Sequence, residues 1–187
     1  MKTLLQYTIA ILIPMSLWNC QPVLKAPAAT IYSATLPTPE IDTTEIKEQL
    51  PDADFSLRVK TLDGKLVNME DYRGKVIFLN FWATWCMPCV AELPSINKLY
   101  NQFKDDNIIF LLVSNENSEK VKSYKTRKKY DIPFYIIDED GSVPHQYYSR
   151  SIPTTFIINK EGKVVKASLG AEDWDDKEFV ETLKKML

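Results

Sequence analysis

Two cysteines, Cys86 and Cys89, flank a Met-Pro pair directly after the apolar run Val76–Trp82 and at the start of a helix-like stretch. Thiols at this spacing can close a reversible disulfide, a pattern typical of redox chemistry on other proteins' cysteines. The first turn of a helix has unpaired N–H groups and a partial positive charge, so it favours the nucleophilic thiolate. We therefore expect Cys86, at the strand-to-helix corner, to be the nucleophile and Cys89, one turn further in, to be the resolving thiol.

Two other uses of these cysteines are less favoured. A structural disulfide over so short a loop would remove little chain entropy, about 2 kcal/mol against ~3 kcal/mol for a fifteen-residue loop. A zinc site usually takes four ligands, and this chain offers only Cys20, Cys86, Cys89 and His145 before carboxylates are considered. We expect no bound metal, and we expect His145 to be a surface or boundary residue.

The N-terminus reads as an export signal over residues 1–19. Lys2 supplies positive charge, and Leu4–Trp18 is mostly apolar but too short and interrupted for a membrane span. Ser16–Cys20 resembles a bacterial lipobox with Leu three residues before the cysteine, although Trp18 and Asn19 depart from the usual small residues. We expect lipidation of Cys20, which attaches the chain to a membrane; an uncleaved anchor with an incidental cysteine is the alternative.

Residues 20–50 read as a tether, because four prolines stand there among Ala and Thr without a sustained period. The folded domain is expected over 51–187, a length that suits one core. The net charge is −2 and no basic stripe runs along the chain, so nucleic acid is not an expected partner.

Strand-like and helix-like segments alternate over the expected domain. Asp63-Gly64 and Lys160–Gly162 are turn signals between paired strands, and Asp175 with Glu178 resembles a capping box. The expected strands are Phe55–Lys60, Leu66–Asn68, Val76–Trp82, Ile108–Ser114, Phe134–Asp138, Thr154–Asn159 and Lys163–Ser168, and the expected helices are Met87–Phe103, Ser118–Lys129 and Asp175–Leu187. This order predicts an α/β sandwich with a central mixed sheet, an N-terminal β-hairpin and a C-terminal helix, with the cysteine pair beyond the carboxyl end of a strand.

The segments Phe81–Cys89, Glu92–Pro94 and Ile152–Phe156 together resemble the TlpA/ResA-like family, from about Pro51 to the C-terminus. That family comprises membrane-tethered thiol-disulfide oxidoreductases of bacterial envelopes. The resemblance implies a thioredoxin-like α/β/α sandwich and a cell-envelope or periplasmic location. It also implies protein disulfides and thiols as substrates, with apo-cytochrome c as one family example, and a membrane dithiol donor that restores the reduced state. The redox-active Cys86–Cys89 disulfide takes the place of any cofactor.

The resemblance also gives roles to further residues. Pro153 matches the family's cis-proline, whose loop lies against the cysteine pair and leaves the backbone of Ile152 free to pair with an extended substrate. The expected substrate groove comprises Trp85, Met87, Pro88 and Ile152, whereas Trp82 is expected in the core.

Glu92 stands three residues after Cys89, so the two share a helix face. A carboxylate there can accept the proton that Cys89 must lose. The family's reducing members carry Glu at this place, while thioredoxin keeps a buried acid six residues before its first cysteine, where this chain has Asn80. Glu92 therefore favours net reduction; an exposed Glu near a helix N-terminus is the alternative.

Two other functions remain open at this point. One is a copper-binding, chaperone-like module of related fold, which would use a histidine near Pro153, whereas His145 lies eight residues earlier. The other is a thiol peroxidase, a class that rarely starts a helix with Trp-Cys-x-Pro-Cys.

Overall fold

Seven strands form one mixed sheet in a computed structural model that describes residues 51–139 and 143–187. The expected signal peptide, Cys20 and the tether lie outside these ranges. The strand order is β2-β1-β5-β4-β3-β6-β7; β3 is parallel to β4 and β4 to β5, and the other neighbours are antiparallel. The strands are β1 (Arg58–Thr61), β2 (Leu66–Asn68), β3 (Val76–Trp82), β4 (Ile108–Ser114), β5 (Phe134–Ile137), β6 (Thr154–Ile158) and β7 (Val164–Leu169).

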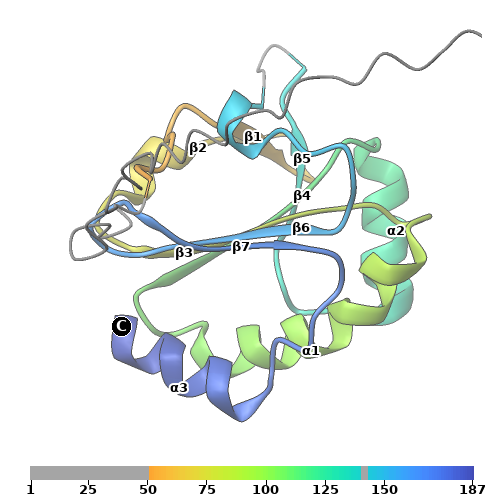
Figure 1. Cartoon of the computed structure of the whole chain (residues 1–187). Helices are drawn as coiled ribbons and strands as arrows, with labels where there is room; N and C mark the ends of the chain where they lie inside the picture. Colours follow the sequence, from red (N-terminus) through yellow and green to blue (C-terminus); the bar gives the residue numbers. More distant parts are fainter. Residues whose placement is uncertain (1–50, 140–142) are drawn as a thin grey trace, which may run out of the picture. The chain divides into compact units, whose positions relative to one another are not determined.

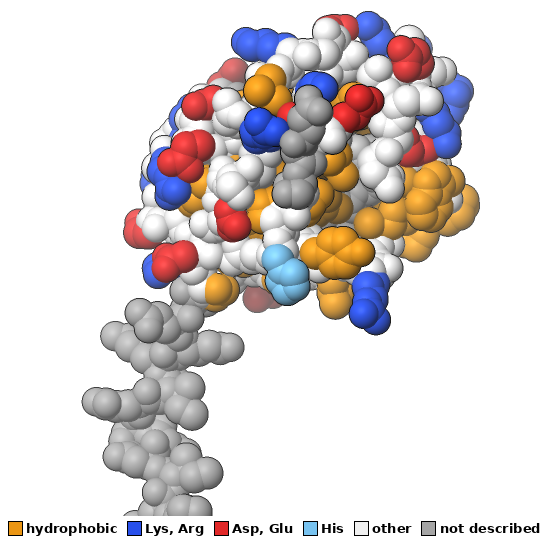
Figure 2. Space-filling model, turned by 90° about the horizontal axis from the view of Figure 1, so that it is seen from above, with side chains coloured by type: hydrophobic (Ala, Val, Ile, Leu, Met, Phe, Trp, Pro, Cys, Tyr) orange, Lys and Arg blue, Asp and Glu red, His pale blue; other side chains and the backbone are white. Residues whose placement is uncertain are grey.

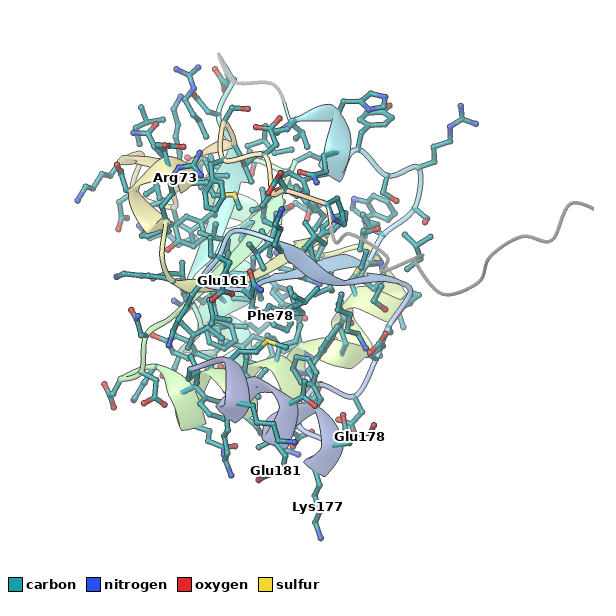
Figure 3. The ribbon with its side chains drawn as sticks, turned by 60° about the vertical axis from the view of Figure 1, so that its left-hand side comes forward. Arg73, Phe78, Glu161, Lys177, Glu178 and Glu181 are labelled. Carbon is teal, nitrogen blue, oxygen red and sulfur yellow. A yellow bond between two sulfur atoms is a disulfide. The ribbon has the colours of Figure 1, made fainter. Side chains whose placement is uncertain are left out.

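Three α-helices build the core on one face of the sheet: α1 (Met87–Phe103), α2 (Ser118–Lys128) and α3 (Lys177–Met186). Side chains along a strand alternate between faces, and those of Val76, Phe78 and Trp82 in β3 belong to this core. Figure 1 shows α1 and α3 beneath the sheet. Phe78 lies inside the domain, whereas Lys177 at the start of α3 points away from it (Figure 3).

The opposite face of the sheet packs against a second hydrophobic core. The β3 side chains that alternate with those of the first core belong to it. It is covered by the segment 53–57 and by two short 3₁₀ helices, η1 (Met69–Tyr72) and η2 (His145–Tyr147). All seven residues of β3 are therefore buried, which explains its unbroken apolar run. The expected thioredoxin-like sandwich, a mixed sheet flanked by helices on both faces with a C-terminal helix, is confirmed, although the helices of the second face are short 3₁₀ helices.

Three connecting segments meet at the carboxyl ends of β3 and β4. β3 and β4 run parallel and in register up to Trp82 opposite Ser114. β6 runs antiparallel to β3, with Thr154 opposite Phe81. The chain therefore leaves β3 and β4 and enters β6 at the same end of these strands. This end lies beside the N-terminus of α1.

Four of the ten expected elements have the observed bounds, namely β2, β3, β4 and α1. The others differ by one or two residues at an end, except β1, whose start differs by three. β1 begins at Arg58 rather than Phe55, because Phe55 and the residues after it reach the second core from irregular backbone. The expected capping box is wrong: Asp176 caps α3, and its Oδ1 accepts hydrogen bonds from the backbone N–H groups of Glu178 (2.9 Å) and Phe179 (3.1 Å).

Candidate active site

Cys86 and Cys89 form a disulfide at the N-terminus of α1. Cys86 is the N-cap residue, and its Sγ accepts a hydrogen bond from the backbone N–H of Cys89 at 3.2 Å. Pro88 stands in the first turn, where its missing N–H leaves no helix bond unmade. Cys86 is 5% exposed and Cys89 is fully buried, so only the first sulfur is open to a partner molecule.

The loop before β6 lies against this disulfide. The Ile152–Pro153 peptide bond is cis, and the carbonyl oxygen of Ile152 is 3.6 Å from Cys86 Sγ. The loop is fixed at both ends, since Pro153 accepts a hydrogen bond from the N–H of Gly170 (2.9 Å) and Thr154 Oγ1 donates to the carbonyl of Ser151 (2.7 Å). The structure thus brings Pro153 and Cys86, which are far apart in sequence, to one place.

Large side chains stand exposed around the nearly covered sulfur. Trp85 is 64% exposed and Met87 77% exposed, Pro88 is exposed, and Ile152 is half-buried. Trp82 is buried in the core, as expected. The four residues expected in the substrate groove therefore lie on the segments that carry or face the disulfide, and three of them can be touched by a partner.

The loop that precedes Cys86 is held by Glu116, which the sequence did not single out. Its carboxylate accepts hydrogen bonds from the backbone N–H (2.6 Å) and the hydroxyl (2.9 Å) of Thr84 and pairs with Lys120 at 2.5 Å. Burial would raise the pKa of the Glu116 carboxyl, but the bonds from Lys120 and Thr84 outweigh it and hold this pKa below its ordinary value. Glu116 is a fixed anion that positions the loop.

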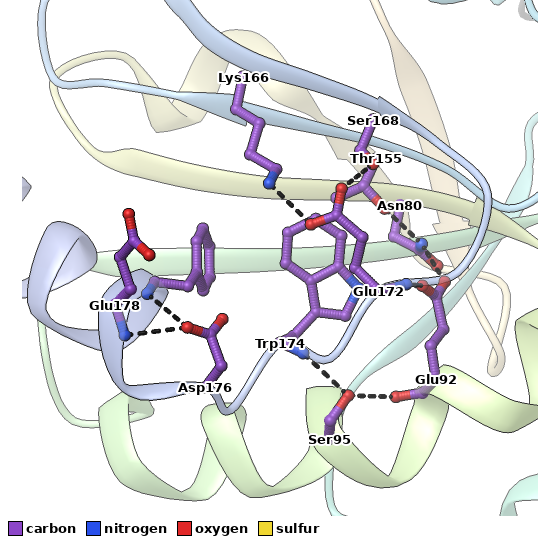
Figure 4. Close-up of polar contacts among 11 residues, drawn as sticks. Asn80, Glu92, Ser95, Thr155, Lys166, Ser168, Glu172, Trp174, Asp176 and Glu178 are labelled. Carbon is purple, nitrogen blue, oxygen red and sulfur yellow. Dashed lines mark hydrogen bonds and ion pairs between the residues drawn. The ribbon is translucent and has the colours of Figure 1, made fainter.

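Glu92 is buried, 3% exposed, so the alternative of an exposed Glu is wrong. Figure 4 shows its carboxylate surrounded by donors from other elements. Asn80 Nδ2 on β3 donates to Oε1 at 2.9 Å, while Trp174 Nε1 (2.9 Å) and the backbone N–H of Glu172 (3.3 Å) donate to Oε2. Asn80 also donates to Thr155 Oγ1 on β6 at 2.9 Å.

These contacts set the protonation of the site. Burial raises the pKa of the Glu92 carboxyl above its ordinary value of 4.5, and the negative charge of Glu172 adds to the rise. The three hydrogen bonds oppose this rise without cancelling it. Glu172 itself accepts from Lys166 Nζ at 2.7 Å and from Ser168 Oγ, and these bonds outweigh burial and hold the pKa of its carboxyl below the ordinary value.

Sequence reasoning missed most of this network. Asn80 offered a signal, because it is the one polar residue in the strand run Val76–Trp82 and a buried amide needs partners. Trp174 and Glu172 offered none, since they lie in the connection between β7 and α3, outside every expected element. His145 is exposed on η2. Within residues 51–139 and 143–187, no three His, Cys, Asp or Glu side chains gather as a candidate metal site.

Residues 45–185 match the family model of Redoxin. The thiol-disulfide oxidoreductase ResA of Bacillus thuringiensis subsp. konkukian is 38% identical over 130 residues, which span 68% of this chain and 73% of that protein. A thiol:disulfide interchange protein from Bacteroides sp. has a similar solution structure, with a TM-score of 0.62 and 26% identity over 73% of this chain and 88% of that one. The exposed lipoprotein thioredoxin of Streptococcus pneumoniae is similar with a TM-score of 0.56 and 30% identity, covering 70% and 98% of the two chains.

A mixed sheet with flanking helices and a cysteine pair at a helix N-terminus define a thioredoxin-fold thiol-disulfide oxidoreductase. The chain belongs to the Redoxin family and, within it, to the TlpA/ResA-like enzymes.

Replacement of Trp174 by Phe removes one donor from the Glu92 carboxylate and keeps a ring in the core. We expect W174F to lower the free energy of unfolding by about 2 kcal/mol near neutral pH, and by less in acid, where the carboxyl is neutral. Urea unfolding across pH measures this difference. W82F is the matched control, because Trp82 Nε1 has no hydrogen-bond partner within the described residues. A loss in W174F that does not change with pH contradicts the assignment.

Replacement of Glu92 by Gln should change how stability depends on pH. The pKa of Glu92 is raised in the folded protein, so its favourable contribution is complete below about pH 4.5 and is lost as the pH rises through the folded pKa. The free energy of unfolding of the wild type should therefore fall, relative to that of E92Q, as the pH rises from about 4.5. Parallel stability profiles for the two proteins would contradict the raised pKa.

Proposed function

We propose that this enzyme reduces disulfides in other proteins of the cell envelope, with Cys86 as nucleophile, Cys89 as resolving thiol and Glu92 as proton acceptor. The observation that carries the proposal is the buried carboxyl of Glu92, one turn after Cys89 in α1 and with a raised pKa. A carboxylate of raised pKa accepts a proton more readily than an ordinary one. The same carboxyl would return the proton to Cys89 in the reverse reaction. The direction proposed here, net reduction, therefore rests on the Glu that the family's reducing members carry at this place.

The proposed reaction begins with the reduced dithiol. The Cys86 thiolate, stabilised by the N–H of Cys89 and by the helix N-terminus, attacks one sulfur of a partner disulfide and expels the other as a thiolate. The Cys89 thiol then gives its proton to Glu92, and its sulfur attacks Cys86 Sγ. The Cys86–Cys89 disulfide forms, the second partner thiolate leaves and takes up a proton, and two electrons have passed to the partner.

The substrate approaches along the cis-proline loop in this proposal. The backbone of Ile152 pairs with an extended partner segment, and Trp85, Met87 and Pro88 contact it from the other side. Protein disulfides are the substrate class, with apo-cytochrome c as an example from the family. A dithiol donor in the membrane returns the enzyme to its reduced state, so the enzyme needs no cofactor besides its own disulfide.

Variants of the three proposed residues separate the steps of this reaction. C86A should abolish reduction of insulin disulfides. C89A should still attack and should accumulate a mixed disulfide with its partner. E92Q should form the mixed disulfide at the wild-type rate and resolve it at least tenfold more slowly. Rapid quenching with an alkylating reagent, followed by mass spectrometry, measures both steps.

Two outcomes would reject the proposal. An E92Q enzyme that resolves the mixed disulfide like the wild type at every pH removes Glu92 from the mechanism. Tight copper(I) binding by the purified protein without any insulin reduction would favour a copper-binding module instead.

The proposed location follows from export by residues 1–19, with lipid attached at Cys20 at the head of the tether. The S. pneumoniae relative, described as an exposed lipoprotein, supports this arrangement. No helix in the described ranges combines the length and the apolar character of a membrane span.

The lipid anchor can be tested in cells that express the chain and grow in medium with a radioactive fatty acid. We expect label in the wild type and none in C20A, and we expect the wild type to sediment with membranes. C86A is the control, because it also removes one thiol and should keep the label. An unlabelled wild type, or label retained by C20A, excludes lipidation at Cys20.

A further inference from the structure

A largely apolar cavity of about 480 Å³ opens beside the disulfide. Its lining includes Phe81 at the end of β3, Val113 at the end of β4 and Ile137 at the end of β5, together with Val143 and Tyr148. The carboxyl ends of three adjacent parallel strands thus form one side of it. Binding sites in open α/β sheets commonly lie at this edge.

Ile152 connects the cavity to the redox site. Its side chain lines the cavity, while its carbonyl oxygen lies 3.6 Å from Cys86 Sγ. A polypeptide that follows the backbone of Ile152 with a sulfur at Cys86 therefore passes the mouth of the cavity. Successive side chains of an extended segment are about 3.3 Å apart and point to opposite sides, so a residue close to the substrate cysteine can enter it.

The chemistry of the lining restricts what can enter. None of the ten residues that form it is charged, so a Lys, Arg, Asp or Glu side chain would lose its water without a charged partner. The volume is within the range of ligand sites and exceeds what one aromatic ring needs. Trp82 also contributes to the lining.

The surroundings of the disulfide are apolar as well. Five large hydrophobic side chains are exposed within the described residues, and four of them belong to this region. Trp85 and Met87 flank Cys86, Tyr148 lines the cavity, and Leu169 pairs with Thr154, the residue after Pro153. Figure 2 shows a large group of hydrophobic side chains at the right-hand edge and another beside the single histidine.

We propose that this cavity is a specificity pocket that seats an apolar, aromatic-sized side chain of the substrate polypeptide within two residues of its cysteine. The inference rests on the proposed function, since the pocket acts on the partner segment that Cys86 attacks. It adds a selection step: among exposed disulfides, the enzyme prefers those flanked by an aromatic or large aliphatic residue.

Peptide disulfides provide the test. Symmetrical disulfide dimers of a short peptide carry Phe, Ser or Lys at one of the four positions within two residues of the cysteine. The rate of reduction by the reduced full chain is divided by the rate with dithiothreitol, which removes differences in intrinsic reactivity. At one position at least, Phe should be reduced about tenfold faster than Ser, and Lys no faster than Ser. If the Phe and Ser peptides are reduced at equal relative rates at every one of the four positions, the proposal is overturned.

Variants connect this preference to the cavity. V143D introduces a carboxylate at a half-buried position of the lining, and the Phe-to-Ser ratio should fall below about twofold while the Lys peptide gains. L66D makes the same kind of change at an exposed hydrophobic residue of β2, a strand at the edge of the sheet, and should keep the wild-type ratio. Y148A, a surface substitution, should also lower the ratio and serves if V143D does not fold by circular dichroism.

Two further outcomes separate this proposal from the function on which it rests. Hydroxyethyl disulfide has no side chain to seat, so its reduction reports the cysteine pair alone. A wild type that reduces neither it nor any peptide overturns the proposed function. A wild type that reduces every disulfide without preference, or a V143D variant with an unchanged ratio, overturns the pocket and leaves the function standing.

Discussion

A buried carboxylate is tolerated only where hydrogen-bond donors replace its water, and Glu92 meets this condition with donors from two other parts of the chain. Asn80 comes from the central strand, and Trp174 with the N–H of Glu172 from the connection between β7 and α3. The helix that carries the cysteines is thereby joined to the sheet and to the C-terminal segment through one charged group. Ser95 adds to this joint, because its hydroxyl accepts from the N–H of Trp174 and donates to the carbonyl of Glu92.

The site must stabilise the thiolate of Cys86 and must also accept the proton of Cys89, and different groups meet these two requirements. Cys86 lies at the helix N-terminus, where the N–H of Cys89 and the partial positive charge of the helix favour its thiolate. Cys89 is fully buried, an environment that favours the neutral thiol, so its proton needs an acceptor nearby. In the proposed mechanism Glu92 is that acceptor. Burial raises the pKa of its carboxyl, so it takes up a proton more readily than an ordinary carboxylate does.

The helices and strands could be predicted from the sequence where a hydrophobic pattern or a turn residue specified them. The hydrogen-bond network around Glu92 could not be predicted in this way. The unbroken apolar run in β3 predicted a strand buried on both faces, and the expected bounds of α1 and β4 are those observed. The cap of α3 was misplaced by one residue, because adjacent Asp175 and Asp176 are equally good caps locally; Asp176 caps the helix and Asp175 pairs with Lys98 at 2.7 Å. Trp174 became a partner of Glu92 only through packing between residues 82 positions apart.

Selection of partners has to come from the surroundings of the sulfurs, because every protein disulfide presents the same two atoms to Cys86. Cys86 is almost covered, so an attacking geometry is reached only after the partner has settled against the exposed residues around it. Those residues are apolar, and their contacts gain free energy in proportion to the area they remove from water. The groups that hold Glu92 come from β3 and from the connection between β7 and α3, and none of them lines the cavity. Recognition and proton transfer can therefore change independently, one through the residues at the mouth of the cavity and the other through those that hold Glu92.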